Sequence, residues 1–407
     1  MTVRQVIGTG VAWIPLAFLV DGVTMLLLPV RLAGFDGTAT ALGLISFLGL
    51  GFALLVQPLA GLVSDRVRDR VDRRAFMVGS ALPAIAGLWV LAGPTAVPLA
   101  ALGYVVLQAG ASALQAALQA LIPEQIAPTA RGRAAGWKTS FDLGGAFLAF
   151  VVLGLLLADG NAVAAATTTT GLLIGALALV IALVPGRRPP GASEPGVASS
   201  AAAAEHATPP RRGHWPAGFA RLITARFLFL LGAFGVSRFL LLIVADRLEI
   251  APSRAADEAG LLLAALALLT VLAAVPLGRL ADRRGRLPVM AMGVVLSAAG
   301  ILALVPSAGV AGVLIGGALM SGGTAAFVTA NWAALTDLAP GPDAGRLMGI
   351  ANIGTGGAAA SAGLLGPLID AGGFGPALAV AAAATACALL PVLVRSGTPG
   401  DGGLRPA

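Results

Sequence analysis

The chain has 407 residues, of which 57% are hydrophobic and only 11% are charged, whereas about 25% of the residues in an average soluble protein are charged. So few charges cannot cover two or three soluble domains, and the composition therefore excludes a soluble enzyme, a nucleic-acid-binding module and a disordered scaffold. It predicts a polytopic membrane protein whose net charge of +7 lies mainly in its loops.

Apolar stretches close to the length of about 20 residues that crosses a bilayer divide the chain into twelve predicted helices. The first six lie at 8–30, 40–63, 75–93, 98–122, 135–158 and 162–184. The second six lie at 222–245, 259–280, 288–306, 309–334, 347–369 and 375–394. We therefore expect an N-terminal six-helix bundle at 1–184 and a C-terminal bundle at 221–407 that ends in a short cytoplasmic tail. The segment 185–220 is rich in proline, alanine and arginine, and we expect a flexible linker there because such a composition cannot bury a core.

The basic residues predict how the helices are oriented. Almost all of them are counted with the segments on the side of the two termini, including Arg221 just ahead of the seventh span and Arg226 near its start. The opposite side holds only Arg31, Arg247 and Arg254. By the positive-inside rule, both termini are expected in the cytoplasm. Together with a composition typical of a high-GC source, this predicts a multi-pass protein of a bacterial inner (plasma) membrane.

Residues that usually hold metals or cofactors are scarce in this chain. Both histidines lie in the predicted linker, and the single cysteine, Cys387, lies in an apolar stretch. No disulfide framework, metal site or histidine proton relay is therefore expected. The glycine string at 354–357 follows no strand and lacks the spacing of a nucleotide-binding loop. We expect no cofactor and no ATP site, so the energy for any transport would come from an ion gradient or from the gradient of the solute.

Short motifs recur in the two halves at a nearly constant offset, which indicates a tandem duplication of six helices. The segment from Gly61 to Arg66 follows the second span, and its counterpart from Gly278 to Arg286 follows the eighth. A parallel repeat of this kind places a solute site near the middle of the membrane, between the two halves.

The second copy, Gly278-x-x-x-Asp282-Arg-Arg-Gly285-Arg286, resembles the loop signature of the major facilitator superfamily. The resemblance covers essentially the whole chain. The first copy, read from Gln57-Pro58 onward, is similar to the sucrose and glycoside–cation symporter branch. This resemblance implies an all-α membrane protein with twelve transmembrane helices in two pseudo-symmetric six-helix bundles. It also implies a sugar or glycoside as solute, moved by rocking of the halves about a central site.

The repeated loop is the candidate gate of the transporter. The resemblance implies that Asp65 and Asp282 each cap a neighbouring helix and latch the cytoplasmic side, while adjacent arginines pair with nearby acids. The alternative is that the loop serves only to set topology. The gating candidates are Gly61, Asp65, Arg66, Gly278, Asp282, Arg283, Gly285 and Arg286.

Asp21 and Arg238 are the mid-span acid and the mid-span base of the chain. A charge at the bilayer centre costs about 3 kcal/mol on insertion scales, so each indicates a functional site. Alignment of the two halves puts them at neighbouring equivalent positions on helices 1 and 7. We expect them to pair directly or through water or solute, with Asp21 taking up protons; the alternative is a purely structural ion pair.

Asp142 is the other acid within a span, and it lies four residues after Lys138, the only lysine. This spacing predicts a local salt bridge on the fifth helix. A functional role for Asp142 is the alternative.

Polar side chains form a stripe on each of two pseudo-equivalent helices, and either solute contact or helix–helix contact explains them. The fourth helix carries Gln108, Ser112, Gln115 and Gln119. The tenth carries Ser321, Thr324 and Asn331. Trp13 and Trp332 are candidates for stacking on a sugar ring, with ordinary packing as the alternative.

The predicted function is secondary active transport of a small polar solute by alternating access. Sodium-using members of the branch that the chain resembles carry acid clusters in helices 2 and 4. Helices 2 and 4 here contain no acid, so the comparison favours coupling to protons, or facilitated diffusion, over sodium coupling. The motifs that the resemblance leads us to expect of drug–proton antiporters, in helices 4 and 5, are absent. Export of a metabolite or drug is the first alternative, and a non-transporting membrane assembly factor on the same fold is the second. The expected partners are the solute, protons and the lipid bilayer, with no nucleic acid, and the protein is expected to be a monomer.

Overall fold

The computed structural model describes residues 2–34, 38–66, 72–93, 96–126, 131–184, 216, 218–252, 254–306, 309–338 and 344–393. Within these ranges the chain forms helices and no strands. Eleven of the helices are long and apolar enough to cross a membrane. The prediction of an all-α, multi-pass membrane protein is therefore confirmed. The predicted linker lies almost entirely outside the described residues.

The first half begins with a helix that is broken several times. It consists of α1 (Val3–Gly10), α2 (Trp13–Ala17), the π-helical segment η1 (Phe18–Leu27) and α3 (Leu28–Ala33). Five long helices follow: α4 (Ala39–Arg66), α5 (Arg73–Ala92), α6 (Val97–Gln125), α7 (Arg131–Ala158) and α8 (Ala162–Leu183). π-Helical turns are rare and concentrate at functional sites, so η1 marks the segment around Asp21.

The second half begins with a continuous helix and is broken instead near its end. Its helices are α10 (Phe219–Leu248), α11 (Ala256–Arg284), α12 (Arg286–Ala303), α13 (Gly309–Asp337), α14 (Ala344–Ser361), α15 (Gly366–Gly372), α16 (Phe374–Cys387) and α17 (Leu389–Leu393). The predicted span 347–369 is not one continuous α-helix, because the 3₁₀ turn η4 (Ala362–Leu365) separates α14 from α15.

Several polar residues and glycines set the helix ends. The Asp72 carboxylate accepts a hydrogen bond from the Arg74 N–H and caps α5, and the Asn161 amide oxygen caps α8. Gly285 has φ +91°, a conformation that favours glycine, and it allows α11 to turn directly into α12. The helices are therefore terminated locally at these loops.

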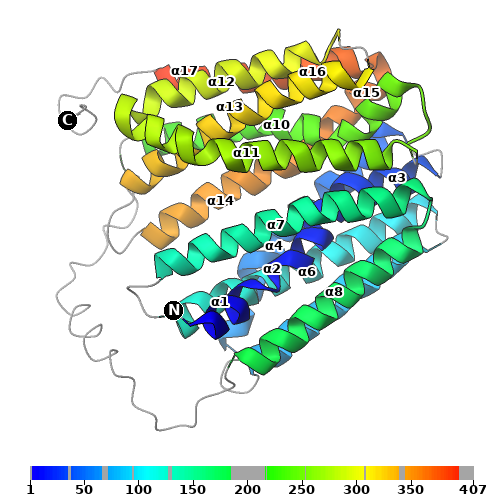
Figure 1. Cartoon of the computed structure of the whole chain (residues 1–407), viewed down its shortest axis with the longest axis vertical. Helices are drawn as coiled ribbons and strands as arrows, with labels where there is room; N and C mark the ends of the chain where they lie inside the picture. Colours follow the sequence, from blue (N-terminus) through cyan, green and yellow to red (C-terminus); the bar gives the residue numbers. More distant parts are fainter. Residues whose placement is uncertain are drawn as a thin grey trace.

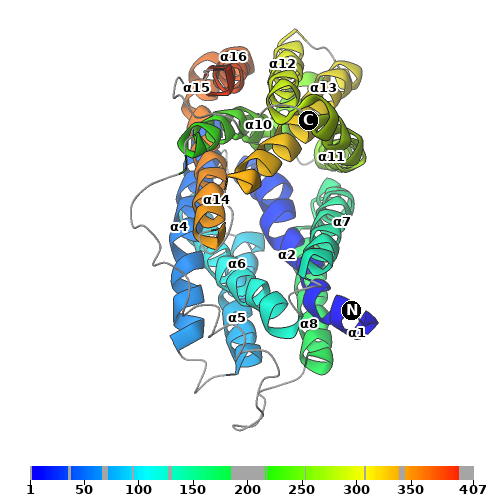
Figure 2. The same ribbon diagram turned by 90° about the vertical axis from the view of Figure 1, so that its left-hand side faces the viewer.

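The two halves lie side by side with their long helices roughly parallel (Figure 1). We call the end of the bundle where α1 begins and α17 ends the terminal end, and the opposite end the distal end (Figure 1). Seen from the terminal end, α7 faces α11 and α4 faces α14 across the boundary between the halves (Figure 2). In Figure 1, α7 and α11 converge toward the distal end.

Glycines bring the backbones of the two halves into contact at the distal end. A Cβ built on Gly43 of α4 would overlap the Gly363 carbonyl oxygen of η4, and one on Gly366 would overlap the Ala39 carbonyl oxygen. The same holds for Gly260 of α11 and the Phe150 carbonyl oxygen of α7. We call these contacts the glycine seam. Side chains are absent at these positions because the backbones approach too closely to leave room for them.

One side chain also crosses the boundary beside the glycine seam. The Asp370 carboxylate, on α15, accepts hydrogen bonds from the backbone N–H groups of Ala39 (2.9 Å) and Thr40 (2.8 Å), the first residues of α4. An acid from the second half thus caps a helix of the first half. At the terminal end, by contrast, a Cβ built on Gly61, Gly136 or Gly349 would meet no atom within 4 Å.

Candidate functional site

Asp21 and Arg238 lie where η1 of the first half contacts α10 of the second half. Asp21 is half-buried, and Arg238 is 1% exposed. The Asp21 carboxyl lies within electrostatic range of Arg238, Asp142 and Lys138. Among the described side chains, however, no ion pair of 4 Å or less joins Asp21 to Arg238. The fold therefore brings the two predicted charges together across the boundary without direct contact.

Arg238 lies beside a hydrogen-bonded group in the first half. The hydroxyls of Thr24 and Tyr104 are 2.9 Å apart, and the Gln108 amide donates to both, at 3.2 Å and 2.8 Å. Arg238 lies next to the Tyr104 hydroxyl and donates from Nη2 to the Ala359 carbonyl oxygen at 3.3 Å. Its Nε and Nη1 are buried and have no hydrogen-bond partner. A buried cation with two unused donor groups can donate hydrogen bonds to an anion or a carbonyl oxygen without rearranging its own contacts.

A second group of charges lies on the first half, nearer the terminal end. Lys138 Nζ lies 3.0 Å from an Asp142 carboxylate oxygen, so the predicted i,i+4 salt bridge is confirmed. The same ammonium lies 3.8 Å from the centroid of the Trp13 ring, a cation–π distance. Trp13 is 1% exposed, and Lys138 covers one face of its ring. This geometry favours a packing role for Trp13 over stacking on a sugar.

Arg226, which the sequence analysis counted with the cytoplasmic basic residues, is a buried cation within a helix. Helix α10 begins at Phe219, so Arg226 lies two turns inside it and is 6% exposed. Its Nε donates to the Thr355 hydroxyl at 2.7 Å and its Nη1 to the Asn331 amide oxygen at 3.2 Å. The guanidinium carbon lies 5.1 Å from the centroid of the Trp332 ring. The apolar residues that precede Arg226 were the signal that it lies within the span.

The polar stripes divide into buried and accessible residues. Gln108, Ser112, Ser321 and Asn331 are buried, whereas Gln119 is exposed. Gln115 and Thr324 are half-buried. The Gln108 amide bonds to the hydroxyls of Thr24 and Tyr104. The Asn331 amide accepts from Arg226 and donates to the Leu222 carbonyl oxygen at 3.1 Å. Their contacts join helices within each half, and Trp332, 38% exposed, remains the more accessible aromatic candidate.

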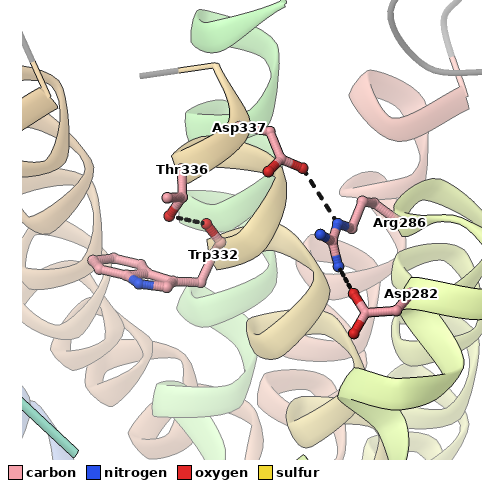
Figure 3. A network of polar contacts seen from close by, with 5 residues as sticks. All are labelled: Asp282, Arg286, Trp332, Thr336 and Asp337. Atoms are coloured by element: carbon pink, nitrogen blue, oxygen red, sulfur yellow. Dashed lines mark hydrogen bonds and ion pairs between the residues drawn. The ribbon is translucent and has the colours of Figure 1, made fainter. Parts of the chain in front are cut away.

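The second copy of the gating loop forms an ion-pair group within its own half (Figure 3). Arg286 pairs with Asp282 on α11 and, at 3.3 Å, with Asp337 at the end of α13. The Trp332 ring points away from this group. Asp282 and Arg283 are exposed, and Gly278 and Gly285 are half-buried. In this arrangement Asp282 contacts its own half, and its predicted role as a latch between halves stays a prediction.

The first copy is described only in part. Gly61 is half-buried and Arg66 is exposed at the end of α4. The side chain of Asp65 and the residues 67–71 lie outside the described part of the chain. Arg73 donates to the Ser64 hydroxyl at 2.9 Å, so this loop also makes contacts within its own half. In neither copy do the described residues group three side chains that could hold a metal ion.

Comparison with known proteins identifies the fold. The family model described as Major Facilitator Superfamily matches residues 15–256 and 250–406. Among solved structures, a peptide transporter POT in complex with sulfate superposes with a TM-score of 0.73 at 16% identity, covering 96% of this chain and 94% of that one. The nucleoside transporter NupG gives 0.70 at 12% identity, covering 96% and 98%.

A bacterial homolog of the human lysosomal transporter Spinster, solved in an inward-facing and unoccupied conformation, gives a TM-score of 0.69 at 14% identity. The match covers 96% of this chain and 95% of that chain. No curated protein matches the chain by sequence.

Proposed function

Since this chain belongs to the major facilitator superfamily, we propose that it is a proton-coupled symporter of a small polar solute, working by alternating access. Membership makes the chain a multi-pass membrane transport protein rather than an enzyme. The proposal adds the coupling ion, the site and the solute class. A sugar or glycoside is the first solute class to test, because the loop after the second span resembles that branch.

One observation carries the proposal: an acid and a base within spans of different halves lie in electrostatic range but not in contact. A carboxylate near a fixed cation is stabilised in its charged form, and it takes up a proton more readily when the cation moves away. Rocking of the halves changes the separation between Asp21 on η1 and Arg238 on α10. Movement of the halves is thereby linked to protonation of Asp21.

The proposed orientation follows from the basic loops. With both termini in the cytoplasm, the terminal end faces the cytoplasm and the glycine seam closes the outer side. The arrangement described above is then an inward-facing one. Opening of the outer side requires the seam and the Asp370 cap to separate, and closure of the inner side brings the two gating loops toward each other.

The test is Asp21→Asn in proteoliposomes with an imposed proton gradient. The transported solute is first found by screening the purified protein for thermal stabilisation by sucrose, methyl β-D-glucoside, methyl β-D-glucuronide, nucleosides and dipeptides. We expect Asp21→Asn to abolish uphill uptake while exchange of labelled for unlabelled solute continues, since exchange needs no net proton movement. Asp142→Asn is the matched control, because Asp142 already has Lys138 as its partner. Uphill uptake at the wild-type level by Asp21→Asn would disprove the role of Asp21.

A further inference from the structure

We propose that Arg226 binds an anionic group of the transported solute, and that the solute carries a carboxylate. This inference rests on the proposed transport function and narrows its substrate class. The basic residues inside the spans differ in whether an acidic side chain lies near them. Lys138 is paired with Asp142, and Arg238 has Asp21 within electrostatic range. No acidic side chain in the described part of the chain pairs with Arg226 or lies near enough to interact with it electrostatically.

An arginine inside a span is costly and normally has a counter-charge or a functional reason. Arg226 is 6% exposed, and its protein partners are neutral: a hydroxyl, an amide oxygen and an aromatic ring. The surroundings therefore leave one positive charge uncompensated. A solute carboxylate would complete the charge balance.

Hydrogen bonds to neighbouring helices also fix the orientation of the Arg226 guanidinium. Thr355 and Asn331 fix Nε and Nη1, and the Leu222 carbonyl oxygen in turn fixes the Asn331 amide. Nη2 makes no hydrogen bond to the described residues and is not one of the fully enclosed unpaired nitrogens. Its N–H groups thus remain for a ligand. A positioned guanidinium is well suited to a carboxylate because the loss of side-chain freedom has already occurred on folding.

Trp332 places an apolar surface beside this cation. Its ring lies 5.1 Å from the guanidinium carbon, and the residue is 38% exposed. A solute that put its carboxylate on Arg226 could lay its carbon skeleton against the indole. Arg226 and Trp332 together therefore favour a small organic acid, such as a uronic acid or an amino acid derivative, over an inorganic anion.

The first experiment measures the positive charge near Trp332 and does not require the solute to be known. The chain has five tryptophans, and a variant that keeps only Trp332, with phenylalanine at 13, 89, 137 and 215, reports on this position. We expect Arg226→Gln to reduce quenching of Trp332 fluorescence by iodide at least about twofold while quenching by neutral acrylamide is unchanged. Arg279→Gln, which removes an exposed arginine of the same half, is the control. Equal iodide quenching with and without Arg226 would overturn the proposal.

The second experiment compares methyl β-D-glucuronide with methyl β-D-glucoside, in which a hydroxymethyl group replaces the carboxylate, and N-acetylalanine with its amide. Binding is measured from Trp332 fluorescence in the purified full chain. We expect the carboxylate member of a pair to bind, and Arg226→Gln to weaken it by about ten- to a hundredfold, with Arg226→Lys intermediate. Binding of only the neutral members, or of no carboxylate member at 10 mM or below, would overturn the proposal. Neither measurement involves transport. Their results therefore test the role of Arg226 independently of the uptake assay on Asp21→Asn, which tests the proposed proton coupling.

Discussion

The Asp370 cap offers a direct way to test the two arrangements of the halves that the proposed alternating access requires. Its carboxylate accepts hydrogen bonds from two backbone N–H groups, those of Ala39 and Thr40. The bonds exist only while the distal ends of the halves are in contact. Asp370→Ala should therefore destabilise the distally closed arrangement and leave the distally open one, in which water binds both partners, almost unchanged.

The size of the effect follows from the geometry. Loss of a helix cap costs about 0.5–2 kcal/mol, which corresponds to a shift of about two- to thirtyfold in the ratio of open to closed molecules. Asp370→Asn keeps one carbonyl oxygen as an acceptor but loses the charge at the helix N-terminus. We expect its shift to lie between those of the wild type and Asp370→Ala.

The assay is double electron–electron resonance between spin labels at the distal ends. Labels at Asp159 and Ala251, both exposed and on different halves, are introduced after Cys387 is replaced by serine. We expect a larger fraction of long distances in Asp370→Ala. Asp72→Ala is the matched control, since Asp72 also caps a helix but within its own half. An unchanged distance distribution in folded Asp370→Ala, or an equal change in Asp72→Ala, would refute the reasoning.

Two further substitutions test other contacts described above. Gly260→Ala adds a Cβ that overlaps the Phe150 carbonyl oxygen, so we expect the same labels to report distal opening, whereas Gly171→Ala, where a Cβ meets no atom within 4 Å, should leave the distances unchanged. Tyr104→Phe removes the hydroxyl that bonds to Thr24 and to the neighbouring glutamine; we expect a loss of about 1–2 kcal/mol in stability, and an unaltered melting temperature would show that this buried group contributes nothing.

The sequence predicted the features that depend on local pattern. Spans follow from hydropathy alone, because a bilayer demands a long apolar helix, and the Lys138–Asp142 pair follows from helical spacing. The proximity of Asp21 and Arg238 was predicted from the internal repeat, which carries information about positions far apart in the chain. In these cases the helical period or the tandem duplication is enough to determine which residues lie close together.

Other features depend on contacts between distant segments that no spacing encodes. Arg226 was counted with the cytoplasmic basic residues because charge usually marks a span boundary, and its partners Thr355 and Asn331 come from two other helices. Tyr104 is one aromatic residue in an apolar helix, and its role becomes visible only beside Thr24 and Arg238. Asp370 follows its predicted span and has no partner nearby in sequence. The contacts of these three residues are revealed only by tertiary packing.

The glycine seam has a consequence for the speed and energy of the conformational change that we propose. Interfaces filled by long side chains must order those side chains each time they form, at a cost of about 0.5–1.5 kcal/mol for each one immobilised. The seam between Gly43, Gly363 and Gly366 has no side chains to order, because it joins backbone to backbone. Its formation and release carry little entropy, and no rotamers are exchanged. The two arrangements can therefore lie close in free energy, so that one proton or one bound solute is enough to decide between them.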